Sequence, residues 1–178
     1  RGGLPVAAEV AERLNGDLDV VIVRKLRAPQ NPELAIGSIS EDGETFLDEN
    51  LIDQMNVSED YLEEEKNRQM ARIKDRRQRY RDVHEKVTLE DRVVVVTDDG
   101  LATGATMRAA VWAAQTYDPA RLIAGVPVGA EDSVNDLAEH ADEVVCVRVP
   151  SSFGAVGAFY ERFTQVSDEE VVQILTEQ

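Results

Sequence analysis

RVVVVTDDGLATGAT, the sequence from Arg92 to Thr106, combines a valine run, a pair of acids and a small-residue loop. Four consecutive valines are typical of a strand covered on both faces, as in the parallel sheet of an α/β protein. The loop after the acids is predicted to lead into a helix from about Met107. Because ligands of open α/β sheets bind at the carboxyl ends of strands, this loop is the first candidate for a binding site.

The residues after the valines are suited to a phosphorylated sugar. The loop Ala102-Thr103-Gly104-Ala105-Thr106 supplies hydroxyls and free N–H groups at a helix N-terminus, which suits a phosphate. Asp98 and Asp99 suit sugar hydroxyls or a cation. One alternative is that the acids only cap the next helix of an ordinary doubly wound domain. A kinase-type P-loop is disfavoured further, since the sequence contains no GxxxxGK[ST].

Composition limits the class of protein further. The 178 residues fit one domain. The sequence contains no apolar run of 18 residues, so no membrane-spanning helix is predicted. The single cysteine, Cys146, fits a reducing cytoplasm. A formal charge of −16 disfavours nonspecific binding to nucleic acid or to an acidic membrane. The acids are spread along the chain and arginine outnumbers lysine, so we expect a protein adapted to a salty, halophilic cytoplasm.

The stretch from Arg92 to Thr106 resembles the phosphoribosyl pyrophosphate signature of the type I phosphoribosyltransferases. The resemblance makes Asp98 and Asp99 the ribose-binding acids and Thr103–Thr106 the loop that holds the 5′-phosphate. Two positions depart from the family pattern. Gly100 stands where an aliphatic residue is common. Ala102 stands where purine-using members often carry an acid that is credited with deprotonating the base.

Two further segments resemble pyrophosphate-binding parts of the same family. Arg1-Gly2-Gly3 resembles the glycine loop that follows the first core strand, which implies that this strand precedes Arg1; a terminal tail is the alternative. An amphipathic helix is predicted directly after it, over 4–14. Leu18–Val23 is predicted to be a buried strand that ends in Arg24-Lys25. This pair resembles the RK of adenine-type and orotate-type members at the pyrophosphate end of the donor, with a solvated pair as the alternative.

The remaining segments are predicted to form an insert, two βα units and a hood. The insert covers 33–90. It begins with a hairpin over 33–47 that turns at Asp42-Gly43, and the resemblance implies that this hairpin closes over the active site. A charged helix is predicted over 58–82. Its arginines are interpreted as compensating the helix dipole. Strands over 122–128 and 143–149 flank a helix over 131–139. The hood covers 150–178 and contains three candidates for stacking on an acceptor base, or for ordinary packing: Phe153, Phe159 and Tyr160.

The resemblance covers nearly the whole chain and extends to a group of predicted phosphoribosyltransferases. It implies a single domain over 1–178, with a Rossmann-like parallel sheet, flanking helices, a flexible hairpin and helix insert, and a small C-terminal hood. It also implies transfer of a phosphoribosyl group from 5-phosphoribosyl 1-pyrophosphate to a nitrogen acceptor. Mg²⁺ would bind through the substrate, with Asp98 and Asp99 as its candidate protein ligands. A homodimer is expected. A non-catalytic sensor, and hydrolysis or phosphorolysis of a sugar phosphate, remain as alternatives.

Overall fold

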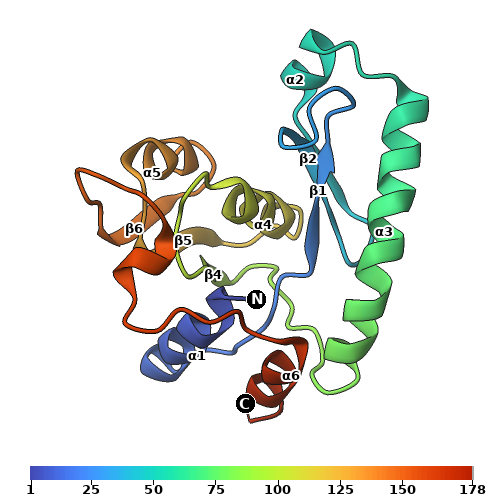
Figure 1. Cartoon of the computed structure of the whole chain (residues 1–178). Coiled ribbons are helices and arrows are strands. Elements are labelled where there is room, and N and C mark those ends of the chain that lie inside the picture. The colour runs from blue at the N-terminus through green and yellow to red at the C-terminus, as the bar shows by residue number, and fades with distance from the viewer. Residues whose placement is uncertain (178) are drawn as a thin grey trace.

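A three-stranded parallel sheet forms one half of the molecule (Figure 1). The computed structural model describes residues 1–177. The strands β4 (Val93–Thr97), β5 (Arg121–Val128) and β6 (Glu143–Arg148) lie in this order. Helix α4 (Ala105–Gln115) connects β4 to β5, and α5 (Glu131–Leu137) connects β5 to β6. The predicted parallel α/β sheet is therefore confirmed, with element boundaries within about two residues of those predicted.

The two faces of this sheet differ in burial. Val96, Leu122 and Ala124 pack with Met107 and Val111 of α4 in one apolar core. The opposite face carries exposed valines, with relative exposures of 64% for Val93, 36% for Val95, 46% for Val145 and 83% for Val147. The prediction that the valine run is covered on both faces is wrong for the described chain. Strand side chains alternate in direction, so Val93 and Val95 point away from α4.

A second, antiparallel sheet forms with a long helix beside it (Figure 1). Its strands are β1 (Val23–Arg27), β2 (Ala35–Ser40) and β3 (Thr45–Leu47), followed by α2 (Glu49–Gln54) and α3 (Glu59–Arg81). The predicted hairpin is confirmed, and Gly43 adopts φ +86° in its turn. Ser58 caps α3 by accepting a hydrogen bond from the Tyr61 N–H at 3.3 Å, as its position predicts.

Residues 18–22 belong to no helix or strand, so the strand predicted over 18–23 is wrong. Strand β1 begins at Val23, so Arg24 and Lys25 lie inside an antiparallel strand and not at the end of a parallel one. A cavity of about 360 Å³ separates residues 18–22 from β4, and within the described chain neither segment pairs with the other. Leu18 and Ile22 are still buried, so the apolar pattern reflects packing without a hydrogen-bonded ladder.

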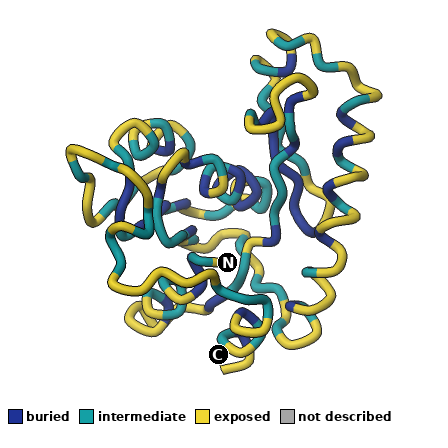
Figure 2. Tube along the Cα trace, viewed as in Figure 1, coloured by how far each residue is buried: buried dark blue, intermediate teal, exposed yellow. Residues whose placement is uncertain are grey.

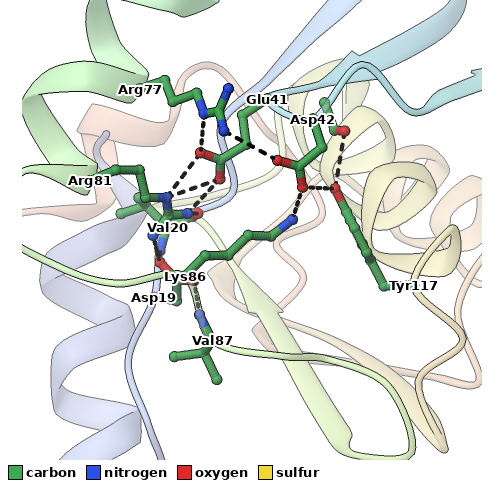
Figure 3. A network of polar contacts seen from close by, with 10 residues as sticks. Asp19, Val20, Glu41, Asp42, Arg77, Arg81, Lys86, Val87 and Tyr117 are labelled. Carbon is green, nitrogen blue, oxygen red and sulfur yellow. Dashed lines mark hydrogen bonds and ion pairs between the residues drawn. The ribbon is translucent and has the colours of Figure 1, made fainter.

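A polar network holds the hairpin turn to the rest of the molecule (Figure 3). The Arg81 guanidinium, near the end of α3, donates to Asp19 Oδ1 at 2.6 Å and to Glu41 Oε1 at 2.5 Å. Beside it, Asp42 accepts hydrogen bonds from Lys86 and from the Tyr117 hydroxyl that follows α4. The network therefore fixes the second sheet relative to the parallel sheet through charged contacts.

The first and last helices pack together below the two sheets (Figures 1 and 2). Helix α1 (Gly3–Leu14) contacts β4 and α6 (Asp168–Thr176), and a short 3₁₀ helix η1 (Val156–Phe159) precedes α6. Ser167 and Glu170 form the capping box of α6. Buried positions concentrate along β2, α4 and β5 (Figure 2). No helix within residues 1–177 is long and apolar enough to span a bilayer.

Candidate active site

The two acids lie directly after β4, at the carboxyl edge of the parallel sheet. Both are half-buried, and the Asp99 N–H donates to Asp98 Oδ1 at 3.0 Å. Burial, followed by the neighbouring charge of Asp98, raises the pKa of Asp99 above the usual range of an aspartate. A raised pKa means that the ionised form of Asp99 is less stable in the folded protein than in water. A cation or a set of hydroxyl donors at this edge would relieve that cost.

The glycine loop at the start of the chain packs onto these acids. A β-carbon added to Gly3 would lie 2.6 Å from both the Asp98 α-carbon and the Thr97 carbonyl oxygen. A β-carbon on Gly2 would overlap the Asp99 carboxylate. The structure thus places Gly2 and Gly3 beside acids almost one hundred positions later. In the first turn of α1 the Leu4 N–H already donates to the Arg1 carbonyl at 3.1 Å and Pro5 has no N–H, so the backbone donors left beside the acid pair are those of Gly2 and Gly3.

The loop between the acids and α4 is held by backbone contacts. The Leu101 N–H donates to the Val128 carbonyl at 2.9 Å, and the Ser133 hydroxyl donates to the Ala102 carbonyl at 2.7 Å. Gly104 adopts φ +69°, in the left-handed region that favours glycine, and is the N-cap of α4. Thr103 and Thr106 are exposed on either side of it. A fixed loop with exposed hydroxyls at a helix N-terminus is suited to hold a phosphate.

The two departures from the family pattern have different structural settings. A β-carbon on Gly100 would lie 2.8 Å from Val156 Cγ1 and 3.1 Å from the Val128 carbonyl oxygen. Val156 of η1 therefore fills the space that an aliphatic side chain at position 100 would need. Ala102 is exposed and offers only a methyl group, with its carbonyl already accepting from Ser133. No proton-accepting side chain stands at position 102 itself.

A cavity of about 370 Å³ joins segments that are distant in sequence. Its lining includes Arg1 and Gly3 of the glycine loop, Arg24 and Lys25 of β1, and Asp98 and Thr106 at the edge of the parallel sheet. Arg24 is oriented by its Nε–H, which donates to Gln69 Oε1 at 3.1 Å. Although Arg24 and Lys25 do not end a parallel strand, the structure still brings them to the same cavity as Asp98; Asp99 and residues 103–105 are not among its described lining residues.

The aromatic hood residues lie near the acids but outside this cavity. The Tyr160 hydroxyl donates to the Asp99 carbonyl at 2.6 Å, while burial and the charges of Asp99 and Asp98 raise the pKa of Tyr160. Phe153 stacks on Phe159 at 5.6 Å between ring centroids, and the Arg148 guanidinium lies 5.3 Å from the Phe159 ring. None of these three aromatic residues is among the described residues that line the cavity. Of these three, Tyr160 is the residue that bonds directly to the backbone of the acid pair.

Sequence reasoning missed part of the cavity wall. Arg27 of β1 and Arg72 and Arg76 of α3 also line it, although the α3 arginines were interpreted as dipole-compensating. The available signal was the spacing of Arg72 and Arg76, four residues apart and thus on one helix face. Buried Glu65 and Gln69, which extend this face, were also missed. Only the packing of α3 against β1 shows that the helix face with Arg72 and Arg76 is directed toward the cavity.

A metal ion would have few protein ligands at this site. Within residues 1–177, no group of three or more histidine, cysteine, aspartate or glutamate side chains is placed to hold one. The adjacent Asp98 and Asp99 provide two carboxylates at most. A hard cation such as Mg²⁺ would therefore need oxygen ligands from a bound substrate.

A parallel α/β sheet with a glycine loop, acids and a threonine loop at one edge is the arrangement of a phosphoribosyl transferase domain. The family model described as phosphoribosyl transferase domain matches residues 1–163. The chain belongs to this family.

Comparison with individual proteins agrees with this assignment. Two Mycobacterium tuberculosis proteins, "Putative phosphoribosyl transferase MT0597" and "Putative phosphoribosyl transferase Rv0571c", are 42% identical over 175 residues, or 98% of this chain. The chain spans only 40% of the length of each. The crystal structure of TT1426 from Thermus thermophilus matches with a TM-score of 0.94 and 46% identity, over 99% of this chain and 84% of that one.

Proposed function

We propose that the protein transfers a phosphoribosyl group from 5-phosphoribosyl 1-pyrophosphate to a nitrogen acceptor and releases pyrophosphate. One observation carries the proposal: Gly2 and Gly3 pack directly onto Asp98 and Asp99. This contact puts anion-binding backbone N–H groups next to sugar-binding carboxylates. A donor with a phosphate at each end of a ribose needs both kinds of group within one ligand's length.

Each group has a separate role in this proposal. The Thr103–Thr106 loop and the α4 N-terminus bind the 5′-phosphate. Asp98 and Asp99 accept hydrogen bonds from the ribose hydroxyls and favour the positive charge that develops on the sugar ring. The Gly2 and Gly3 amides, with Arg1, Arg24 and Lys25, bind the pyrophosphate and stabilise it as it leaves.

Mg²⁺ fits this site as a metal carried by the substrate. The acid pair holds a carboxylate whose pKa is raised by burial and by its neighbour, which is a setting that a cation stabilises. When bound, Mg²⁺ would neutralise charge on the pyrophosphate and ribose oxygens. Asp98 and Asp99 would be its candidate protein ligands.

The acceptor must ionise readily or lose its proton to a group other than residue 102, because Ala102 cannot accept a proton. We place the acceptor pocket under the hood. Tyr160 is hydrogen-bonded to the backbone of Asp99, and the Phe153–Phe159 pair offers an aromatic surface with Arg148 beside it. Such a surface suits a flat heterocycle.

Calorimetric titration with 5-phosphoribosyl 1-pyrophosphate and Mg²⁺, in molar potassium chloride, tests the donor site. We expect saturable, magnesium-dependent binding that an Asp98→Asn/Asp99→Asn double variant weakens at least about tenfold while its circular dichroism is unchanged. Unchanged affinity in a folded double variant would refute the assigned sugar site.

Turnover assays then separate the reaction classes. Pyrophosphate release that requires a nitrogen acceptor supports transfer. Release of ribose 5-phosphate without an acceptor would show hydrolysis instead, and binding without any turnover would show a sensor. Each outcome assigns the same binding site to a different class of protein.

We also propose that the protein works in the cytoplasm as a homodimer. The single cysteine and the acidic composition support the compartment. The valines exposed on the parallel sheet and the exposed, charged α3 offer surfaces for self-association. Light scattering at high salt should give twice the chain mass; a monomer would remove this part of the proposal.

A further inference from the structure

Unpaired cations gather on one wall of the 370 Å³ cavity. Arg24, Lys25 and Arg27 of β1 and Arg72 of α3 all line it. Within residues 1–177, none of these four has a carboxylate oxygen within 4.0 Å of its charged nitrogens. Arg76, one turn after Arg72, also lines the cavity, and its nearest carboxylate is Asp168 at 3.7 Å. The same carboxylate is shared with Arg1 and Arg79, at 3.3 and 3.9 Å.

This wall is unusual for so acidic a chain. With 35 acids and 19 bases, most surroundings should offer a basic residue a carboxylate partner. Other arginines do have close ones: Arg92 pairs with Asp17, Arg108 with Asp136 and Arg121 with Glu143, each at 2.6 Å. The cavity wall therefore keeps an excess of positive charge that neighbouring acids do not neutralise.

The cations of the wall affect one another. Burial lowers the pKa of Arg24 below the usual value of arginine, and the charges of Arg72, Arg76 and Arg27 lower it further. The charge of Glu65 opposes this shift, but Glu65 is also bound by Arg68 and Gln69. Repulsion among these guanidinium groups costs free energy because the fold keeps them close together. A bound anion would remove that cost.

We propose that Arg72 and Arg76 of α3, with Arg24 and Arg27 of β1, form a binding site for a diphosphate. Its occupant is the pyrophosphate end of the donor, so the identity of the ligand rests on the proposed function. Arg72 and Arg76 lie on one face of α3 and present two planar forks one turn apart, a geometry that matches adjacent phosphate groups. The long helix is then part of the donor site and not only a solvated cover for the hairpin.

Inorganic pyrophosphate is the probe, because it carries the diphosphate without the ribose. Calorimetry should show one saturable site per chain, and Arg72→Gln and Arg76→Gln should each weaken it at least about tenfold. Lys74→Gln is the matched control: Lys74 is exposed on the same helix, makes no ion pair with a described residue and does not line the cavity. It should change affinity less than twofold. Equal losses in all three variants, or no loss in the arginine variants, would overturn the proposal.

Two further variants separate this site from protein stability and from the donor proposal. Arg72→Lys keeps the charge but loses the planar fork, so it should bind pyrophosphate more tightly than Arg72→Gln and more weakly than the wild type. If Arg72 only supported the fold, pyrophosphate affinity would not follow the charge at this position. Asp98→Asn/Asp99→Asn should leave inorganic pyrophosphate binding intact while weakening the donor. Arginine-dependent pyrophosphate binding without any donor binding would leave the arginine site standing and refute the proposed function. Donor binding that depends on Asp98 and Asp99 but not on Arg72 or Arg76 would refute the arginine site and leave the proposed function standing.

Discussion

Gly3 lies against the backbone of Asp98, so closely that a β-carbon at Gly3 would sit 2.6 Å from the Asp98 α-carbon. This contact joins the first turn of α1 to the end of β4, and through it the glycine loop to the acid pair. No flexible side chain can move aside there, because the opposing atoms are backbone. Position 3 therefore has to be glycine for the first turn of α1 to approach Asp98 this closely.

Gly3→Ala should destabilise the protein and weaken donor binding together. Overpacking against backbone typically costs about 1–3 kcal/mol, which for a chain of this size lowers Tm by several degrees. Gly16→Ala is the control, since nothing lies within 4 Å of a β-carbon at Gly16. Thermal unfolding and donor titration of both variants test this; equal behaviour of the two would contradict the close packing.

Asp99→Asn should raise Tm at neutral pH while it weakens the donor. The pKa of Asp99 is raised in the folded protein, so between the unfolded value of about 3.9 and the folded value the native state binds more protons. Ionisation of Asp99 therefore lowers the free energy of unfolding as pH rises through that window, and this loss persists at pH 7. Asparagine carries no such cost.

The gain from Asp99→Asn should shrink as pH falls from the raised folded pKa toward about 4, and it should be absent below that, where the wild-type acid is protonated in both states. Thermal unfolding between about pH 3.5 and pH 7, with exposed Asp53→Asn on α2 as the control, measures the difference. A gain that does not depend on pH would show that ionisation of Asp99 is not its cause.

Arg81→Gln should be among the most destabilising single changes. It would leave Glu41, whose side chain is only 4% exposed, without the guanidinium that bonds both of its oxygens (Figure 3). Removing one partner of a buried ion pair typically costs about 3–5 kcal/mol. Chemical denaturation measures this loss.

Arg77→Gln provides the comparison for Arg81→Gln. Arg77 is 53% exposed and lies 3.8 Å from Glu41 and from Asp42, so its loss should cost less than about 1 kcal/mol. Similar costs for the two variants would mean that the network is not held by buried charge.

Potassium chloride should stabilise the protein strongly. At a formal charge of −16, repulsion among surface acids opposes the compact state, and molar salt screens it to a Debye length of about 3 Å. Circular dichroism should show unfolding on dilution and recovery in molar salt. Full stability in dilute buffer would reject the halophilic interpretation.

The sequence alone determined the local elements of this protein. The valine run, the acids and the threonine loop predicted β4 and the start of α4, because alternation, capping and loop chemistry act within a few residues. The hairpin turn at Gly43 and the Ser58 cap of α3 were predictable for the same reason. The likeness of the acids and loop to a phosphate-binding signature also placed the site at the carboxyl edge of the sheet.

Tertiary structure decided which distant segments meet. Residues 18–22 have a strand-like pattern, yet they form no ladder with β4, since a strand requires a partner that local sequence does not specify. The direction of the α3 arginines, the contact of Gly3 with Asp98 and the burial of Glu41 beside Arg81 likewise depend on chain segments far apart in the sequence. Whether a charge is solvated, paired or aimed into a cavity follows from that packing, and no local pattern encodes it.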